Sequence, residues 1–232
     1  MNQTTPNLDE VLITLNSLAD PGVKASQERF GIQVGRSLGI SLYTLRDLAK
    51  GIHDHQLALA LWETDIHEAR MLAAMIDEPE KVTLQQMEKW VSDFDSWDIC
   101  DITTDEVFIH TPFILDRINA WSTRKEEFVK RAAFASIAAL VIHRKDITDT
   151  QVTPFFILIE QASDDPRNFV KKAVNWALRN IGKFRPGLRK EAWARAETLL
   201  QSDDKTARWI GKDAVREFAK KYGGNYETKS SL

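Results

Sequence analysis

Cysteine is almost missing from this sequence of 232 residues, in which Cys100 is the single example. A lone cysteine excludes an intrachain disulfide and a cysteine-rich zinc site, and it fits a reducing compartment. The sequence also lacks a run of about 18 apolar residues, the length that a membrane-spanning helix needs, and residues 1–10 lack the pattern of a signal peptide. We therefore expect a cytoplasmic protein that makes no contact with a membrane and folds around its own apolar core.

Residue patterns typical of common enzyme sites are missing as well. The five histidines are too dispersed for a metal site, since they stand at His53, His55, His67, His110 and His143. No glycine loop that cradles phosphate and no nucleophile elbow is present. We expect neither a metal nor a cofactor.

Apolar residues recur at the three- and four-residue spacing of amphipathic helices along almost the whole sequence, and the alternation typical of strands is nearly absent. The pairs Thr111-Pro112, Thr153-Pro154 and Asp165-Pro166 are typical of helix starts. These patterns predict an all-α protein. The expected helices cover residues 8–19, 22–34, 41–51, 55–62, 65–76, 83–95, 98–108, 112–121, 126–142, 151–162, 166–181, 187–200 and 204–221.

Glycine and proline are scattered singly, and no low-complexity stretch marks a linker before the end of the sequence. We therefore expect one continuous domain over residues 1–222, followed by a flexible tail over residues 223–232.

Three segments share an aromatic residue, an aliphatic residue, a basic residue and a small one, namely residues 128–133, 169–174 and 209–214. Their starts are 41 and 40 residues apart (128, 169 and 209), which matches the period of about 40–47 residues of HEAT-type helix pairs. A weaker copy occupies residues 67–72. The repeat predicts a HEAT-like α-α superhelix of antiparallel helix pairs, and such stacks curve around a concave groove.

Charge is divided unevenly along the sequence. Residues 1–115 hold 8 Lys and Arg against 19 Asp and Glu, a net charge of −11, while residues 116–232 hold 23 against 15, a net charge of +8, and together these give −3. The excess of positive charge in the second half indicates a polyanionic partner.

Basic residues recur at matching places in the repeat, at Lys130, Arg131, Lys171, Lys172 and Lys212. Stacked repeats would align them into a ladder of cations that suits the phosphate backbone of DNA. Further cations could widen this surface, namely Arg179, Lys183, Arg185, Arg189, Lys190 and Arg208. The alternative is that these side chains form a solvated outer face.

Acidic and aromatic residues gather in residues 90–101. Trp97 and Asp101 are four apart, so a helix that starts near Trp97 would place an indole and a carboxylate on one face. Asp98 falls off that face and is better explained as a first-turn acid that complements the helix dipole. The alternative for Trp97 is a core aromatic beside a helix cap.

A second tryptophan lies on the basic helix that follows residue 166. Trp176 stands four residues after Lys172 and three before Arg179, so its indole shares a helix face with two cations. Tryptophan in so polar a setting is a poor choice for a plain core position.

Residues 96–101, 128–133 and 169–179 resemble, in order and spacing, the AlkD-type DNA alkylation repair glycosylases. The resemblance spans nearly the whole sequence. A further segment, from Phe30 through Gly39-Ile40-Ser41 to Arg46, resembles the lesion-side N-terminal helices of that family, with Phe30 where relatives can carry a tyrosine.

The resemblance implies base excision repair, in which positively charged 3- or 7-alkylated purines are removed from double-stranded DNA. It implies that Asp101 stabilises the sugar cation or activates water, that Trp97 and Trp176 pack against the deoxyribose, and that Arg131 holds a phosphate beside the lesion. It also implies that the base need not be flipped into a pocket. We expect a monomer that acts on nucleoid DNA.

The chemistry of this reaction suits the same residues. Alkylation of a ring nitrogen leaves the purine positively charged, so the base departs as a neutral group and needs little acid catalysis. What remains is to stabilise an oxocarbenium-like sugar, for which a carboxylate and indole faces are suited. The alternative is a HEAT-like module that binds DNA, or a protein-binding scaffold, without glycosylase activity.

Overall fold

A computed structural model of the chain describes residues 6–33 and 35–223 and divides into two compact units, residues 1–113 (unit 1) and residues 114–232 (unit 2). Within the described residues every regular element is a helix, so the prediction of an all-α protein is confirmed. Most of the expected tail lies outside the described residues, which end at Gly223. The expectation of a single continuous domain stays a prediction.

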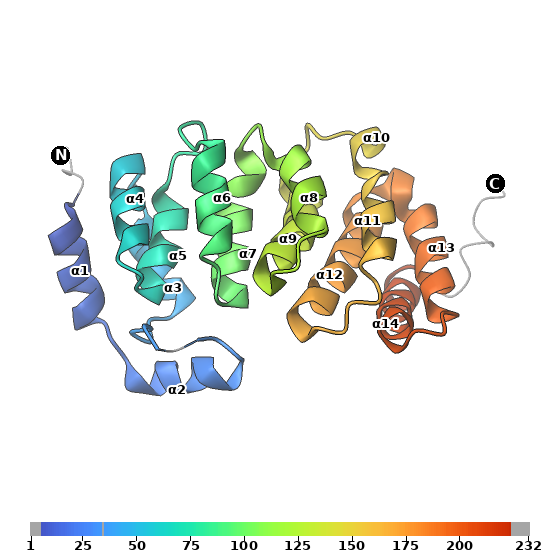
Figure 1. Ribbon diagram of the computed structural model, residues 1–232, viewed down its shortest axis with the longest axis horizontal. Coiled ribbons are helices and arrows are strands. Elements are labelled where there is room, and N and C mark those ends of the chain that lie inside the picture. The colour runs from blue at the N-terminus through green and yellow to red at the C-terminus, as the bar shows by residue number, and fades with distance from the viewer. Residues whose placement is uncertain (1–5, 34, 224–232) are drawn as a thin grey trace. The chain divides into compact units, whose positions relative to one another are not determined.

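Unit 1 contains a series of short helices. Figure 1 shows α4, α5, α6 and α7 side by side, with α2 lying across this row. The elements are α1 (Leu8–Ser17), α2 (Pro21–Arg29), α3 (Leu42–Ala49), α4 (His55–Glu63), α5 (His67–Ile76), α6 (Leu84–Ser92), α7 (Trp97–Glu106) and the 3-10 helix η1 (Phe108–His110).

Polar caps and stacked aromatics organise unit 1. The side chains of Ser41, Asp54 and Thr83 each accept a hydrogen bond from a backbone N–H three residues on, which satisfies the free amides at the starts of α3, α4 and α6. Trp62 of α4 stacks on Trp90 of α6, with ring centroids 4.0 Å apart. Both indoles are almost fully buried, so they tie the two helices together.

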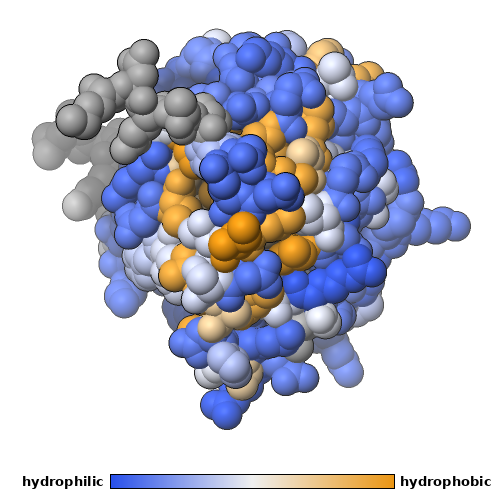
Figure 2. Space-filling view, turned by 90° about the vertical axis from the view of Figure 1, so that its left-hand side faces the viewer, coloured by the Kyte–Doolittle hydropathy of each residue, from blue (hydrophilic) through white to orange (hydrophobic). Residues whose placement is uncertain are grey.

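Two apolar residues are exposed at α1 and its C-terminal end. Ile13 is 70% exposed and Leu18 is 38% exposed. Figure 2 views unit 1 from the side of α1 and shows an apolar patch surrounded by hydrophilic residues. A substitution at Ile13 therefore changes the surface and leaves the core intact.

Unit 2 contains longer helices in pairs. Its elements are α8 (Ile114–Ser122), α9 (Glu127–His143), α10 (Asp149–Val152), α11 (Phe155–Gln161), α12 (Asn168–Phe184), the 3-10 helix η2 (Pro186–Leu188), α13 (Arg189–Leu200) and α14 (Lys205–Tyr222). The second helices of successive pairs pack on one another, α9 on α12 and α12 on α14, which is the neighbour-to-neighbour packing of repeat proteins. In the part of the chain that the structure describes, none of the helices has the length and apolar character to cross a membrane.

The repeat predicted from the sequence is present in unit 2. The aliphatic residue of each copy is buried, with Val129 3% exposed and Val170 and Ile210 fully covered. In the third copy Gly211 replaces the lysine found at 130 and 171. A Cβ atom at Gly211 would lie 2.2 Å from the backbone nitrogen of Leu200, so the close approach of α13 and α14 excludes any side chain there.

Several helix boundaries differ from the sequence-based expectation: α2 ends at Arg29 instead of residue 34, and α8 begins at Ile114 instead of Pro112. The single helix expected over residues 151–162 is divided into α10 and α11, because Pro154 interrupts the chain and serves as the N-cap of α11. The expected cap at Asp165 is wrong, since α12 begins only at Asn168 and its N-cap, Arg167, makes no side-chain cap bond. The Asp165 carboxylate instead binds the side chains of Arg167 and Lys130, which compete with the helix amides for it.

Candidate functional site

Helix α7 presents two of the predicted site residues on one face. It begins at Trp97, so Trp97 and Asp101 are about one turn apart and project to the same side; both are half-buried. The carboxylate of Asp98 accepts hydrogen bonds from Ser96 Oγ at 2.6 Å and from Ile99 N at 3.0 Å. Asp98 is therefore a first-turn acid, as predicted, and its bonds fix the start of α7.

A cavity of about 560 Å³ lies beside this face, and Phe30, Trp97 and Asp101 line it together. Trp97 Nε1 donates to the carbonyl oxygen of Phe30 at 3.1 Å, which ties the indole to the end of α2. The Phe30 side chain is itself 69% exposed, so it borders the cavity on the solvent side. The rest of the lining is mainly apolar and comes from Val23, Ile32, Ile40, Leu42, Met71 and Ile102.

A buried carboxylate shapes the loop that forms one wall of this cavity. Glu68 of α5 is fully buried, and its oxygens accept from Leu38 N and Gly39 N, each at 2.8 Å, and from Ile40 N at 3.2 Å. Ser37 Oγ donates to the same group at 2.8 Å. Because four donors converge on one carboxylate, the loop has a fixed conformation, and this holds Ile40 at the cavity.

The pKa of Glu68 reflects these bonds. Burial raises the pKa, but the hydrogen bonds from Leu38 and Ser37 and the charge of His67 lower it by more, so it lies below the ordinary value. Glu68 is therefore an anion at neutral pH.

Gly39 is required by the same loop. Its φ is +79°, and a Cβ atom there would lie 2.1 Å from the carbonyl oxygen of Asp20. Only glycine allows this backbone conformation and this close approach to the start of α2.

The buried pair of His67 and Asp98 supports the site from behind. His67 Nε2 and Asp98 Oδ2 are 2.9 Å apart. Burial lowers the pKa of His67, but the hydrogen bond and the charge of Asp98 raise it by more, and the pKa of His67 lies above its ordinary value. Burial raises the pKa of Asp98, and His67 lowers it by more. The pair is therefore ionic, and it joins α5 to the start of α7.

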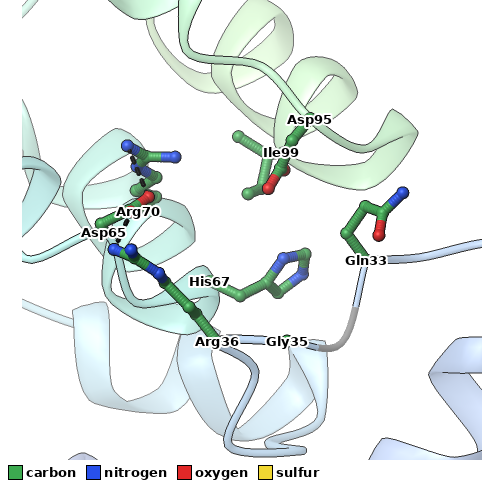
Figure 3. Close-up of a pocket in the computed structure, with 8 residues that line it drawn as sticks. All are labelled: Gln33, Gly35, Arg36, Asp65, His67, Arg70, Asp95 and Ile99. Carbon is green, nitrogen blue, oxygen red and sulfur yellow. Dashed lines mark hydrogen bonds and ion pairs between the residues drawn. The ribbon is translucent and has the colours of Figure 1, made fainter.

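A second cavity, of about 250 Å³, lies on the other side of His67. Figure 3 shows the imidazole of His67 projecting into it, with Asp65 paired to both Arg36 and Arg70 on one side. This cavity is lined by charged groups, whereas the larger one is lined mainly by apolar groups. His67 lines the small cavity and Asp98 the large one, so the ion pair lies between them.

The His67–Asp98 pair predicts a pH dependence of stability. Because the pKa of His67 is raised in the fold, the protonated imidazole contributes its full stabilisation below about pH 6.5, and this is lost as the pH rises through the raised pKa. Because the pKa of Asp98 is lowered, its carboxylate contributes above about pH 3.8. We expect His67→Gln to lower the free energy of unfolding by about 1 kcal/mol more at pH 6 than at pH 8.5. Urea unfolding at both pH values measures this difference.

The matched control for this measurement is His53→Gln, in the exposed loop between α3 and α4. We expect the control to show the same small effect at both pH values. If His67→Gln, like the control, lowers the free energy of unfolding by the same amount at both pH values, the buried pair is not ionised in the way that its geometry indicates.

In unit 2, Arg131 and Trp176 lie on the packed helices α9 and α12. Arg131 is only 6% exposed, and its Nη1 donates to the carbonyl oxygen of Phe169 at 2.7 Å. Trp176 is half-buried. Arg131 thus connects two repeats, and Trp176 keeps part of its indole accessible.

Some side chains of the predicted cation ladder make ion pairs or ring contacts within the protein, and others are exposed. Lys130 Nζ lies 3.0 Å from Asp165 Oδ2. Hydrogen bonding from Arg167, and then from Lys130, holds the pKa of Asp165 far below its usual range. Lys171 Nζ lies over the ring of Trp209, 5.2 Å from its centroid.

Farther along α12, two of the predicted cations pair with α14. Arg179 and Lys183 both bind Glu217, and Lys183 Nζ lies 2.9 Å from a Glu217 oxygen. Of the remaining predicted cations, Arg185 and Arg189 are half-buried, and four are exposed, namely Lys172, Lys190, Arg208 and Lys212. These four are the predicted cations most accessible to a large polyanion.

The sequence analysis did not identify Glu68 or the His67–Asp98 pair as parts of the site. The Glu68 carboxylate accepts hydrogen bonds from backbone amides that lie 28 to 30 residues earlier in the sequence. His67 pairs with Asp98, which lies 31 residues later. The only signal in the sequence is the weak repeat copy at residues 67–72, which points to a packed helix and indicates no such role. Among residues 6–33 and 35–223, no group of three or more His, Cys, Asp or Glu residues could hold a metal ion.

Comparison with known proteins adds two findings. The model of the family of DNA alkylation repair enzymes matches residues 11–221. A solved structure described as "a new family of proteins related to the HEAT-like repeat DNA glycosylases with affinity for branched DNA structures" is similar in fold, with a TM-score of 0.77 and 17% identity, covering 91% of this chain and 95% of that one. No curated protein matches.

Proposed function

Since this chain belongs to the family of DNA alkylation repair enzymes, we propose that it is a glycosylase that excises cationic 3- or 7-alkylated purines from double-stranded DNA. The observation that carries the proposal is the position of Trp97 and Asp101 on one face of α7, where both line a cavity. An indole and a carboxylate together suit a positively charged sugar.

In the proposed reaction the bond between C1′ and the purine nitrogen breaks, and its electron pair moves onto the alkylated base, which leaves as a neutral molecule. The sugar becomes oxocarbenium-like. Asp101 stabilises this cation by its negative charge, and Trp97 stabilises it through the face of its ring. Water then adds to C1′ and loses a proton, which Asp101 can accept.

In this proposal unit 2 binds the DNA backbone. The exposed cations of α12 and α14 contact phosphates, which gives affinity without sequence preference. Arg131 holds a phosphate, and Trp176 packs against deoxyribose.

The test is an excision assay with the full chain on duplex DNA that carries 7-methylguanine and 3-methyladenine. We expect both free bases to appear in the supernatant, where mass spectrometry identifies and counts them. If neither base is released above the spontaneous rate, the glycosylase proposal is wrong.

A non-catalytic DNA-binding role is the second candidate, because the similar solved structure is described as related to the glycosylases and as having affinity for branched DNA. It predicts no base release together with tighter binding of a four-way junction than of a linear duplex of equal length. The excision assay and a junction-binding assay therefore separate the two functions.

Backbone binding by unit 2 gives a second prediction. Lys172→Ala and Lys212→Ala remove exposed cations from equivalent repeat positions. Each is expected to weaken DNA binding and to reduce the slope of log K against log salt concentration by about 0.9. Fluorescence anisotropy with a labelled duplex over a series of KCl concentrations measures the slope.

Lys50→Ala is the matched control, since the Lys50 side chain is 77% exposed on unit 1 and pairs only with its neighbour Asp47 in the described contacts. It should leave the slope unchanged. If the control and both test variants behave alike, α12 and α14 do not contact the backbone.

A further inference from the structure

We propose that the small cavity beside His67 binds a phosphate monoester or inorganic phosphate, with His67 and Arg36 as donors to its oxygens and Asp95 as the acceptor of its proton. The lining of this cavity comes from the segment after α2, the start of α5 and the start of α7. It shares no residue with the lining of the larger cavity. The inference therefore goes beyond the proposed glycosylase function and does not rest on it.

His67 provides a buried donor that the protein itself does not use. The side chain is only 3% exposed, and its Nε2 is bonded to Asp98 at 2.9 Å. Because this pair is ionic, the imidazole also carries a proton on Nδ1, and none of the described residues accepts it. Figure 3 shows the ring projecting into the cavity. An unsatisfied buried donor is costly, and an oxygen of a bound anion satisfies it.

Two guanidinium groups and one carboxylate form the positively charged side of the cavity. Asp65 pairs with Arg36 and, at 2.8 Å, with Arg70, so this cluster keeps one net positive charge. Arg70 also binds the backbone carbonyls of Trp62 and Asp93, whereas Arg36 uses only Nη1 in the described contacts. The Nε and Nη2 groups of Arg36 remain available, and guanidinium N–H groups suit phosphate oxygens.

The backbone at Asp65 has a conformation that is rare for residues other than glycine. Its φ is 57°, and no other non-glycine residue in the described part of the chain has a positive φ. Such conformations cost free energy and cluster at active sites and ligand-binding sites. Here the turn between α4 and α5 places the Asp65 carboxylate between Arg36 and Arg70. Both guanidinium groups are thus ordered before a ligand arrives, which lowers the entropy lost on binding.

A carboxylate facing the same space decides which anion fits. Asp95 is exposed and makes no ion pair or hydrogen bond in the described contacts, and Figure 3 shows it near the His67 ring. A carboxylate repels an oxyanion unless the anion keeps a proton for it to accept. Phosphate monoesters, with a second pKa of about 6, and inorganic phosphate keep such a proton near neutral pH. Sulfate and the phosphodiesters of a DNA backbone have none.

The size of the cavity also fits a small anion. Its volume of about 250 Å³ is below the range of roughly 300–1,000 Å³ typical of sites for larger ligands. Arg36 and Asp95 are both exposed, so they lie where the cavity meets solvent. The phosphate group of a monoester therefore occupies the cavity while its organic part extends into solvent.

The test is isothermal titration calorimetry of the full chain at pH 6.5, with chloride keeping the ionic strength constant. The probes are inorganic phosphate, methyl phosphate, dimethyl phosphate and sulfate. We expect a Kd below about 1 mM for inorganic phosphate or methyl phosphate, and binding at least about tenfold weaker for dimethyl phosphate and sulfate. Tighter binding of methyl phosphate identifies an ester as the ligand, and tighter binding of inorganic phosphate identifies the free anion.

Three variants locate the binding. Arg36→Gln removes an exposed donor and should weaken phosphate binding about tenfold. Its matched control, Arg29→Gln, removes an exposed guanidinium of α2 that does not line the cavity and should bind phosphate like the wild type. Asp95→Asn removes the repelling charge and should bring the sulfate affinity to within about threefold of the phosphate affinity. Circular dichroism melting shows that the variants are folded.

Three outcomes overturn the inference. The first is that the wild type binds neither inorganic phosphate nor methyl phosphate, or binds sulfate equally well. The second is that Arg36→Gln binds phosphate like its control. The third is that Asp95→Asn discriminates against sulfate as strongly as the wild type does. None of these titrations contains DNA, so their outcome is independent of the excision assay.

Discussion

Replacement of Asp101 by asparagine is expected to lower the rate of base release by about 100- to 1,000-fold, the effect typical of removing one electrostatic contact to a transition state. Asparagine keeps the shape of the side chain and removes its negative charge. The sugar cation that forms as the glycosidic bond breaks then loses its counter-charge. DNA affinity is not expected to fall, since a carboxylate repels the phosphate backbone.

Single-turnover excision under enzyme excess measures the chemical step, and anisotropy measures the affinity of the same protein. Asp47→Asn is the matched control, because the Asp47 side chain is 71% exposed on α3 and lines neither of the two described cavities. The control should release base at the wild-type rate. A wild-type rate for Asp101→Asn itself would mean that the carboxylate takes no part in the reaction.

Replacement of Glu68 by alanine is expected to destabilise unit 1 by about 3 kcal/mol or more. The change removes a buried charge and leaves the amides of Leu38, Gly39 and Ile40 without their acceptor. The loop then loses the conformation that holds Ile40 at the larger cavity. Urea unfolding followed by tryptophan fluorescence measures the loss, since Trp97 borders the same cavity.

The same substitution has a predicted pH dependence. Because the pKa of Glu68 is lowered in the fold, its contribution is complete above about pH 4.5 and is lost as the pH falls through the lowered pKa. The gap between wild type and variant should therefore be full at pH 7 and smaller in acid.

Glu28→Ala is the control for the Glu68 substitution, at an exposed position on the neighbouring helix α2. It is expected to change the free energy of unfolding by less than about 0.5 kcal/mol. If Glu68→Ala costs no more than this control, the carboxylate does not hold the loop.

The site was only partly predictable from the sequence. The i, i+4 spacing of Trp97 and Asp101 placed both on one face of α7, and the structure agrees because this relation depends only on helix geometry. Their half-burial and the cavity beside them were not foreseen. Three stretches that are distant in the sequence line that cavity, namely residues 23–42, Met71 of α5 and residues 97–102 of α7.

The capping prediction at Asp165 illustrates the same limit. An aspartate followed by proline is a good local signal for a helix start. Lys130, 35 residues earlier in the sequence, binds the same carboxylate together with Arg167, and the cap is not formed. A tertiary contact and a neighbouring guanidinium thus outweighed the local preference.

Local periodicity and the period of about 40 residues determined the helical class, the repeat of unit 2 and the buried positions Val129, Val170 and Ile210, because a helix and its buried stripe follow from residues a few positions apart. The tertiary structure alone decided which charged side chains form ion pairs within the protein, such as Lys130 with Asp165, and which side chains line a cavity. These depend on packing between helices, where burial strengthens or cancels each charge according to partners that the local sequence does not reveal.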